Sequence, residues 1–179
     1  MMIESNRTNR GMIKIVAIRL GSLNDEVVFL GGATTELLIT DPAAPKTRVS
    51  LDVDVLIEIT SRRDFYKLEE DLRERGFTQN DNESNDPICR WRIDTIIVDV
   101  MPTDSRILGF SNTWYSPAIK LATRYDIDRN IHIQLVTAPY FLATKIEAFY
   151  IFFTTKIFLR AYQDICHPIT QVKQGIRSY

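Results

Sequence analysis

The sequence has no surplus of charge of either sign. It carries 22 Lys and Arg residues against 23 Asp and Glu residues, which gives a formal net charge of -1 at pH 7. Proteins that bind nucleic acid mainly by neutralising phosphates concentrate Lys and Arg on one surface. This composition therefore argues against salt-driven nucleic-acid binding as the whole function, although a local basic patch is compatible with it.

Cysteines are scarce, and so are long apolar runs. The two cysteines, Cys89 and Cys166, have neither the CxxC or Cys/His spacing of a zinc site nor the density of a disulfide scaffold.

The longest apolar stretch, residues 149–158, contains a lysine and is too short to span a bilayer, and the N-terminal MMIESNRTNR has no apolar signal core. We therefore expect a cytoplasmic protein with reduced thiols and no membrane contact.

A chain of 179 residues has the length of one globular domain. Its first half predicts alternating strands and helices. A β-branched and aromatic run at 27–30 stops at paired glycines, which predicts a buried strand, a tight turn and then a short helix. Alternation over 50–59 predicts a second strand. The Ser cap and apolar stripe of 61–75, followed by Gly76, predict a longer helix.

Residues 88–102 alternate between apolar and polar side chains on either side of a turn at 94–95, which predicts an antiparallel hairpin. In its first strand, Arg90 and Arg92 flank Trp91. Two arginines beside an aromatic ring can contact a nucleic-acid backbone and a base. The simpler interpretation, which we favour, is a solvated strand face with the tryptophan buried opposite.

The C-terminal third predicts helices around one more strand. A helix is expected over 117–125, a strand over 131–136, and a last helix from residue 138, where Pro139 suits the first turn. We expect 1–137 to form the core and 138–179 to form a helical extension that packs on it. The apolar residues of this extension also offer a contact between copies in a homo-oligomer.

Asp52 and Asp54 lie on the predicted strand 50–59, opposite its apolar face. Side chains at i and i+2 of a strand project the same way, about 7 Å apart. Two carboxylates so placed can bind one divalent cation or bracket two, and Mg²⁺ prefers oxygen ligands. Asp99, in the second strand of the hairpin, is the candidate for a third carboxylate. The simpler interpretation of an acidic alternation is a solvated strand face.

The order of the glycines, the two aspartates of the strand and Asp99 along the chain makes a metal site a more specific prediction than the aspartates alone. Gly31 and Gly32 precede a short helix, and glycine lets a backbone approach a phosphate. The segments FLGGATTELLITDPAAP, SLDVDVLIEI and IIVDVMP, over about residues 25–102, resemble the motif of the nucleotidyltransferase superfamily: an apolar strand ending in Gly-Gly, then DxD, then a later Asp. LGFSNTWY and APYFLATKIEAF resemble bacterial proteins related to the AbiEii abortive-infection toxins of type IV toxin–antitoxin systems.

This resemblance implies a fold, a cofactor and a reaction. The fold is an α/β (α+β) mixed sheet flanked by helices with a C-terminal helical segment, and the cofactor is Mg²⁺ (or Mn²⁺). The reaction moves a nucleoside monophosphate from an NTP to an acceptor, which in the superfamily is a tRNA, a protein or a small molecule; a toxin would also have a cognate antitoxin. The residues carried over are Asp52, Asp54 and Asp99 as catalytic metal ligands, and Gly31, Gly32, Thr34, Thr35 and Lys145 as nucleotide-binding residues.

The sequence departs from those relatives after Phe149. The resemblance implies an acidic helix there, and only Asp164 is available to take the place of its acids. Two alternatives therefore stay open: a catalytically inactive nucleotidyltransferase-fold module that binds a partner, and a phosphohydrolase that uses the same acidic site and releases phosphate. For Lys145, a side chain that simply reaches solvent is an equal alternative to a triphosphate contact.

Overall fold

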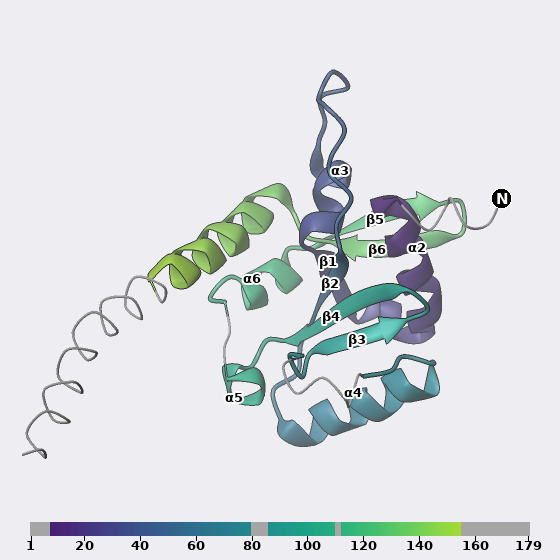
Figure 1. The fold of residues 1–179 in the computed structure, drawn as a ribbon, viewed down its shortest axis with the longest axis vertical. Helices are drawn as coiled ribbons and strands as arrows, with labels where there is room; N and C mark the ends of the chain where they lie inside the picture. The colour runs from purple at the N-terminus through teal and green to yellow at the C-terminus, as the bar shows by residue number, and fades with distance from the viewer. Residues whose placement is uncertain (1–7, 80–85, 110–111, 155–179) are drawn as a thin grey trace, which may run out of the picture. The chain divides into compact units, whose positions relative to one another are not determined.

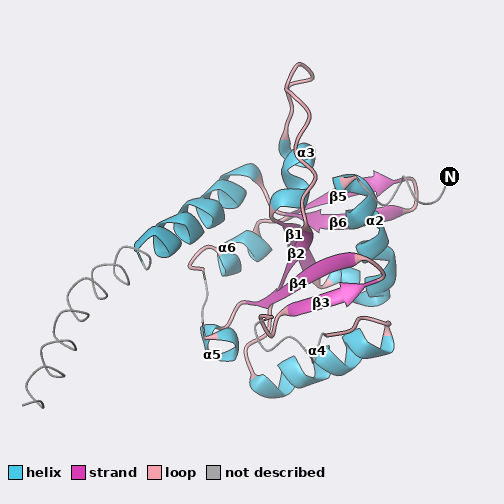
Figure 2. Cartoon of the chain, viewed as in Figure 1, coloured by secondary structure: helices cyan, strands magenta, loops and turns pink. Residues whose placement is uncertain are grey.

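The computed structural model describes residues 8–79, 86–109 and 112–154. The chain divides into two compact units, 1–144 and 145–179. The first unit is built on one six-stranded sheet with the strand order β3-β4-β2-β1-β6-β5 (Figure 1, Figure 2). The strands are β1 (Val27–Leu30), β2 (Asp52–Ile57), β3 (Arg90–Ile93), β4 (Ile96–Pro102), β5 (Thr123–Asp128) and β6 (Ile131–Leu135).

The sheet is mixed and flanked by helices, which confirms the expected fold class. Strand β2 runs parallel to β4, and β1 runs parallel to β6, whereas the β1–β2, β3–β4 and β5–β6 pairs are antiparallel. The helices are α2 (Asn9–Leu20), α3 (Thr35–Leu38), α4 (Arg62–Glu74), α5 (Ser105–Leu108) and α6 (Tyr115–Lys120), with the 3-10 turns η1 (Gly21–Asp25) and η2 (Gly32–Thr34).

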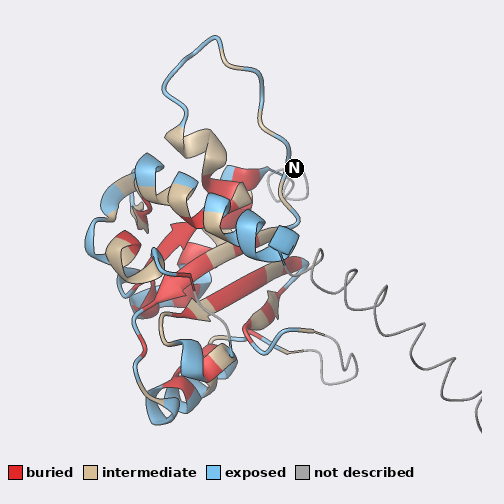
Figure 3. Ribbon diagram, turned by 90° about the vertical axis from the view of Figure 1, so that its left-hand side faces the viewer, coloured by how far each residue is buried: buried red, intermediate tan, exposed pale blue. Residues whose placement is uncertain are grey.

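The two faces of the sheet are covered unequally. One face, which includes Val53 and Trp91, lies in a large core cluster with residues of α2 and α4. On the other face, Leu30 and Leu56 belong to a small cluster with residues of α6 and of the helix that starts at residue 138. Figure 3 shows that the buried residues concentrate in the strands. Because side chains alternate along a strand, the even-numbered residues of β2 point to the sparsely covered face.

Two local predictions are confirmed. The Ser61 side chain caps α4 by accepting a hydrogen bond from a first-turn backbone NH, the apolar stripe of this helix is buried, and Gly76 follows its end with a φ of 84°. Strands β3 and β4 form the expected hairpin, in which Asp94 occupies the turn with a φ of 53°. Trp91 is 1% exposed, as expected, whereas the arginines beside it lie half-buried on the opposite strand face, which is therefore not simply solvated.

The helix expected over 117–125 is wrong in its second half. Helix α6 ends at Lys120, and residues from Thr123 onward form β5, a strand that the sequence pattern did not predict. Strand β5 lies at the edge of the sheet, and most of its residues are exposed. Tyr125 and Ile127 alternate with charged residues and pack on the core, so the two-residue period of a strand is present here but extends over only a few residues, and pairing with β6 settles the conformation.

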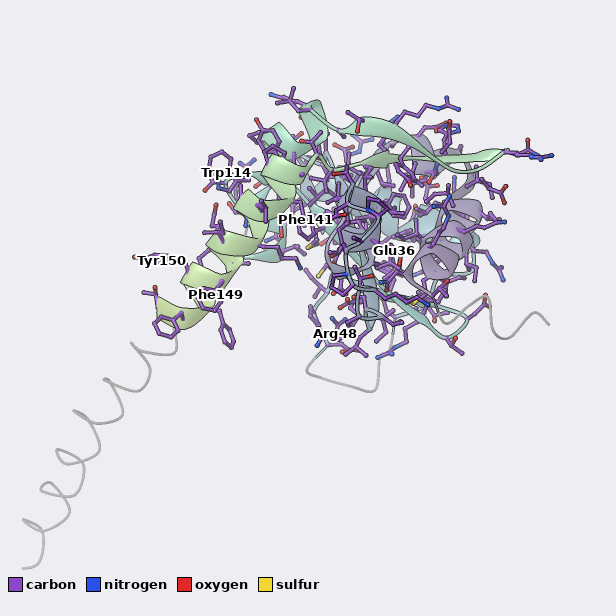
Figure 4. All side chains as sticks on the ribbon, turned by 90° about the horizontal axis from the view of Figure 1, so that it is seen from above. Glu36, Arg48, Trp114, Phe141, Phe149 and Tyr150 are labelled. Atoms are coloured by element: carbon purple, nitrogen blue, oxygen red, sulfur yellow. The ribbon has the colours of Figure 1, made fainter. Side chains whose placement is uncertain are left out.

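The last described helix begins at residue 138, as expected, and is described as far as residue 154. Its first two turns belong to the first unit. In the second unit, Phe149 and Tyr150 are exposed on this helix (Figure 4), and Phe149 stacks on Phe153 with 5.9 Å between ring centroids. The expected boundary at residue 137 and the packing of the extension stay predictions.

Asp164 and Cys166 lie outside the described residues. Over the residues that are described, no helix has both the length and the apolar character needed to cross a membrane.

Candidate metal centre

Three carboxylates converge at the centre of the sheet. Asp54 on β2 pairs in register with Asp99 on the neighbouring strand β4, and Asp52 lies two residues earlier on β2. One carboxylate oxygen from each of the three lies within 4.8 Å of the other two. Asp52 and Asp54 are half-buried, and Asp99 is 9% exposed. The structure thus brings together the three residues that the sequence predicted as metal ligands.

Gly31, at the end of β1, lies directly against this cluster. Strand β1 pairs with β2 so that Leu30 is opposite Asp54, and the chain then turns at Gly31 with φ 81° and ψ -168°. A Cβ atom at this position would lie 1.7 Å from Asp54 Oδ2, and one at Gly32 would lie 2.7 Å from Ser50 Oγ. Gly31 is therefore needed to make room for Asp54, whereas the close atom at Gly32 is the end of the Ser50 side chain, which can rotate away.

Asp52 is held by a chain of hydrogen bonds that starts on helix α2. The Ser50 hydroxyl donates to Asp52 Oδ1 at 3.1 Å, and the Ser50 backbone NH donates to Asn9 Oδ1 at 2.7 Å. The Asn9 amide in turn donates to the backbone carbonyl of Arg48 at 3.0 Å. Asn9 is 2% exposed, and its bonds to Ser50 and Arg48 are partly buried. Sequence reasoning missed both Asn9 and Ser50.

Arg90 is a fourth charged residue of the site, and its role was also missed. Its Nε and Nη2 atoms donate to the two oxygens of Asp99 at 2.9 and 2.8 Å. The same guanidinium lies 3.9 Å from Asp52 Oδ2 and 3.8 Å from Asp86 Oδ1. The hydrogen bonds to Asp99 and the surrounding carboxylates raise the pKa of Arg90 above its usual range. Arg90 is therefore a permanent positive charge beside the acids.

The signal for Arg90 was present in the sequence. In a hairpin with a two-residue turn at 94–95, residues equidistant from the turn face each other, so Arg90 pairs with Asp99. Opposite charges directly across a strand pair attract each other. The predicted hairpin therefore implied that Arg90 and Asp99 lie opposite each other and can form an ion pair.

Comparisons with known proteins agree with this architecture. The sequence matches no family model and no curated protein. The solved structure of an antigenic nucleotidyltransferase-like protein from Paracoccidioides brasiliensis resembles this chain with a TM-score of 0.50 and 21% sequence identity. The match covers 75% of this chain and 62% of the other, so this chain spans under two thirds of that protein's length.

The fold is nucleotidyltransferase-like. A likeness at this level of identity establishes the fold alone, so the chemistry of the site must be judged from its own residues. Octahedral Mg²⁺ holds oxygen ligands at about 2.1 Å, which places those oxygens at most about 4.2 Å apart. The carboxylate oxygens, within 4.8 Å of one another, reach that spacing through small side-chain rotations. The donor set, three carboxylates and no softer ligand, fits a hard divalent cation.

The remaining candidate residues lie in different settings on this nucleotidyltransferase-like fold. Thr34 is fully buried, and its hydroxyl donates to the Gly31 carbonyl at 2.9 Å, so it shapes the glycine turn. Thr35, the first residue of α3, is half-buried. Lys145 is exposed and belongs to the second unit. Nucleotide binding by these three residues stays a prediction.

Cys89 lies next to the site as a buried free thiol. Burial, reinforced by the negative charge of Asp99, raises its pKa to about 11. At neutral pH the group is therefore a protonated thiol, and it does not add to the negative charge of the acidic cluster.

Proposed function

We propose that the chain is a Mg²⁺-dependent (or Mn²⁺-dependent) nucleotidyltransferase that moves a nucleoside monophosphate from an NTP to an acceptor. The observation that carries this proposal is the convergence of Asp52, Asp54 and Asp99 on adjacent strands, beside the glycine turn, in a nucleotidyltransferase-like fold. Carboxylates this close repel one another, and a divalent cation shared with phosphate oxygens is the partner that best suits them.

In this reaction, an acceptor hydroxyl oxygen forms a bond to the α-phosphorus of the NTP and its proton passes to solvent, while the bond from that phosphorus to the bridging oxygen breaks and pyrophosphate leaves with the electron pair. A bound Mg²⁺ supplies charge neutralisation for the phosphates. Asp52 and Asp54 hold and orient the reacting groups, Asp99 completes their acidic cluster, and the backbone at Gly31 and Gly32 binds the triphosphate. Positioning and electrostatics then account for the rate.

The resemblance of LGFSNTWY and APYFLATKIEAF to AbiEii-type proteins supports a narrower proposal, that the chain is the toxin of a toxin–antitoxin pair. Its acceptor would be a tRNA or a protein, and it would bind a cognate antitoxin. In this proposal Lys145 contacts the triphosphate.

The reaction is tested by incubating the chain with each α-³²P-labelled NTP, Mg²⁺ and either bulk tRNA or lysate protein. We expect label to move to one acceptor with release of pyrophosphate, and we expect Asp54→Asn, which keeps the side-chain shape, to abolish this transfer. Arg124→Gln, at an exposed position on β5, is the matched control and should retain it.

Three results would contradict the proposal in different ways. Release of inorganic phosphate without labelled acceptor would indicate a phosphohydrolase. No chemistry, together with a stable protein partner, would indicate an inactive binding module. Transfer that survives Asp54→Asn would show that another site performs the reaction.

A further inference from the structure

We propose that Arg90 is a built-in counter-ion of the acidic site, which takes the place of a divalent cation while none is bound and which a cation at Asp99 must compete with. This inference rests on the metal site of the proposed function. It goes further by assigning a role to a residue of β3 that lies outside the DxD pattern.

The contacts of Arg90 carry the first step. Both oxygens of Asp99 accept hydrogen bonds from this one guanidinium, at 2.9 and 2.8 Å, in the planar paired geometry that makes Arg–carboxylate contacts strong. Its Nη2 atom also lies 3.9 Å from Asp52 Oδ2. Arg90 therefore faces two of the three candidate metal ligands at once.

The charges carry the second step. Asp52, Asp54 and Asp99 together bring three negative charges into a small, partly buried space, and Arg90 reduces this to two. The side chains of Arg90 and Asp99 are only 26% and 13% exposed, so solvent screens their interaction incompletely. Without a cation, the folded site depends on this guanidinium to offset the repulsion between its acids.

The third step is the position of Arg90 on Asp99, because this position shows whether Arg90 competes with a bound cation or only orients Asp99 for it. The guanidinium occupies the edge of the Asp99 carboxylate between its two oxygens. A divalent cation that binds either oxygen of Asp99 shares that oxygen with the guanidinium, because each of the two oxygens already accepts a hydrogen bond from Arg90, and two positive groups close together also repel each other. Removing the positive charge should therefore strengthen cation binding, whereas a residue that only orients a ligand would weaken it when lost.

The test is a Mn²⁺ titration of the full chain, followed by calorimetry or electron paramagnetic resonance, together with thermal unfolding with and without Mn²⁺. For Arg90→Gln we expect a lower Tm without the metal, a larger rise of Tm with it, and Mn²⁺ binding about tenfold tighter or more than in the unsubstituted chain. Arg92→Gln is the matched control. It removes an arginine from the same strand face, one that pairs with Asp86 at 3.0 Å, and it should change Mn²⁺ affinity much less.

A second variant guards against a folding defect. If repulsion among the acids is what weakens Arg90→Gln, then Arg90→Gln combined with Asp99→Asn should recover most of the metal-free Tm. No recovery in the double variant would contradict the counter-ion role.

The outcomes separate this inference from the proposed function. If the unsubstituted chain binds Mn²⁺ and Arg90→Gln binds it equally or more weakly, Arg90 is an orienting residue and the inference fails, while the metal site stands. If neither chain binds Mn²⁺, both the inference and the proposed metal site fail. If Arg90→Gln binds more tightly but no nucleotide is transferred, the inference holds and the proposed reaction fails.

Discussion

Gly31 lies directly against the side chain of Asp54 at the acidic site. The backbone of Gly31 has φ 81° and ψ -168°, a conformation that is essentially limited to glycine, and the missing Cβ leaves the space that the Asp54 carboxylate fills. The residue therefore meets two separate requirements, one of the chain turn and one of the metal ligand. A substitution at Gly31 should affect both stability and cation binding.

We expect Gly31→Ala to lower the free energy of unfolding by about 1–3 kcal/mol or more and to weaken Mn²⁺ binding, because the new methyl group displaces Asp54. Gly21→Ala is the matched control, since Gly21 also has a positive φ but a methyl group there would meet no atom within 4 Å. It should lose stability and keep its Mn²⁺ affinity. Denaturant unfolding and Mn²⁺ titration measure the two effects, and equal Mn²⁺ affinity in both variants would contradict the expectation.

Cys89 predicts a dependence of stability on pH. Its thiol has a pKa of about 11 in the folded chain, against an ordinary value of 9.0. Below pH 9 both states hold the proton, and between pH 9 and 11 the unfolded chain loses it first. Stability should therefore fall by up to about 2–3 kcal/mol as the pH rises through this window. Denaturant unfolding of the unsubstituted chain and of Cys89→Ala isolates the effect, which the variant should lack.

Helix α2 and strand β2 are coupled through Asn9. This residue, the first of the helix, accepts a hydrogen bond from the Ser50 backbone and donates one to the Arg48 carbonyl, so it fixes the segment that leads into β2. The position of Asp52 therefore depends on an element far earlier in the chain.

We expect Asn9→Ala to lower the free energy of unfolding by about 1–3 kcal/mol, because a buried side chain loses its hydrogen bonds to the Ser50 NH and the Arg48 carbonyl, and to weaken Mn²⁺ binding several-fold through Ser50. Thr8→Ala is the control. Thr8 caps the same helix by accepting from the Gly11 backbone NH, so its loss should cost about 1 kcal/mol and leave Mn²⁺ affinity nearly unchanged. Unchanged Mn²⁺ affinity in Asn9→Ala would show that this coupling does not reach the site.

The elements that the sequence predicted are those whose signals are local. The alternation in β2, the cap and stripe of α4, and the hairpin turn at 94–95 each need only a few neighbouring residues to be recognised, and together they place all three aspartates. Strand β5 and the role of Asn9 could not be predicted in this way. The apolar alternation of β5 is limited to Tyr125 and Ile127, which is too short to outweigh a helical interpretation, and a buried asparagine shows its partners only once the chain has folded.

At the scale of the whole molecule, every element of the acidic site lies in the unit of residues 1–144. Strands β2 and β4 are neighbours in the sheet, with other strands on both sides, so the acids lie on two internal strands. The nucleotidyltransferase-like fold and its candidate metal site thus belong to one compact unit, whatever the remaining residues contribute.

We expect a fragment of residues 1–144 to unfold cooperatively and to bind Mn²⁺ as tightly as the full chain. We also expect the full chain to self-associate through the exposed apolar residues of 145–154, and the fragment to stay monomeric. Light scattering and Mn²⁺ titration of both proteins measure these properties. A fragment that fails to bind Mn²⁺ while folded would show that the second unit completes the site.

The turn between β3 and β4 links the charge of the site to the packing of the core. Successive residues of β3 point to opposite faces of the sheet, so that Arg90 binds Asp99 in the acidic site and Trp91 packs in the core. A shift of one residue in the register of β3 would exchange the two faces, placing arginine in the apolar interior and tryptophan among the acids. The register of this hairpin therefore constrains the packing of the core and the charge of the site together, whereas a point substitution at Arg90 or Trp91 changes one of them alone.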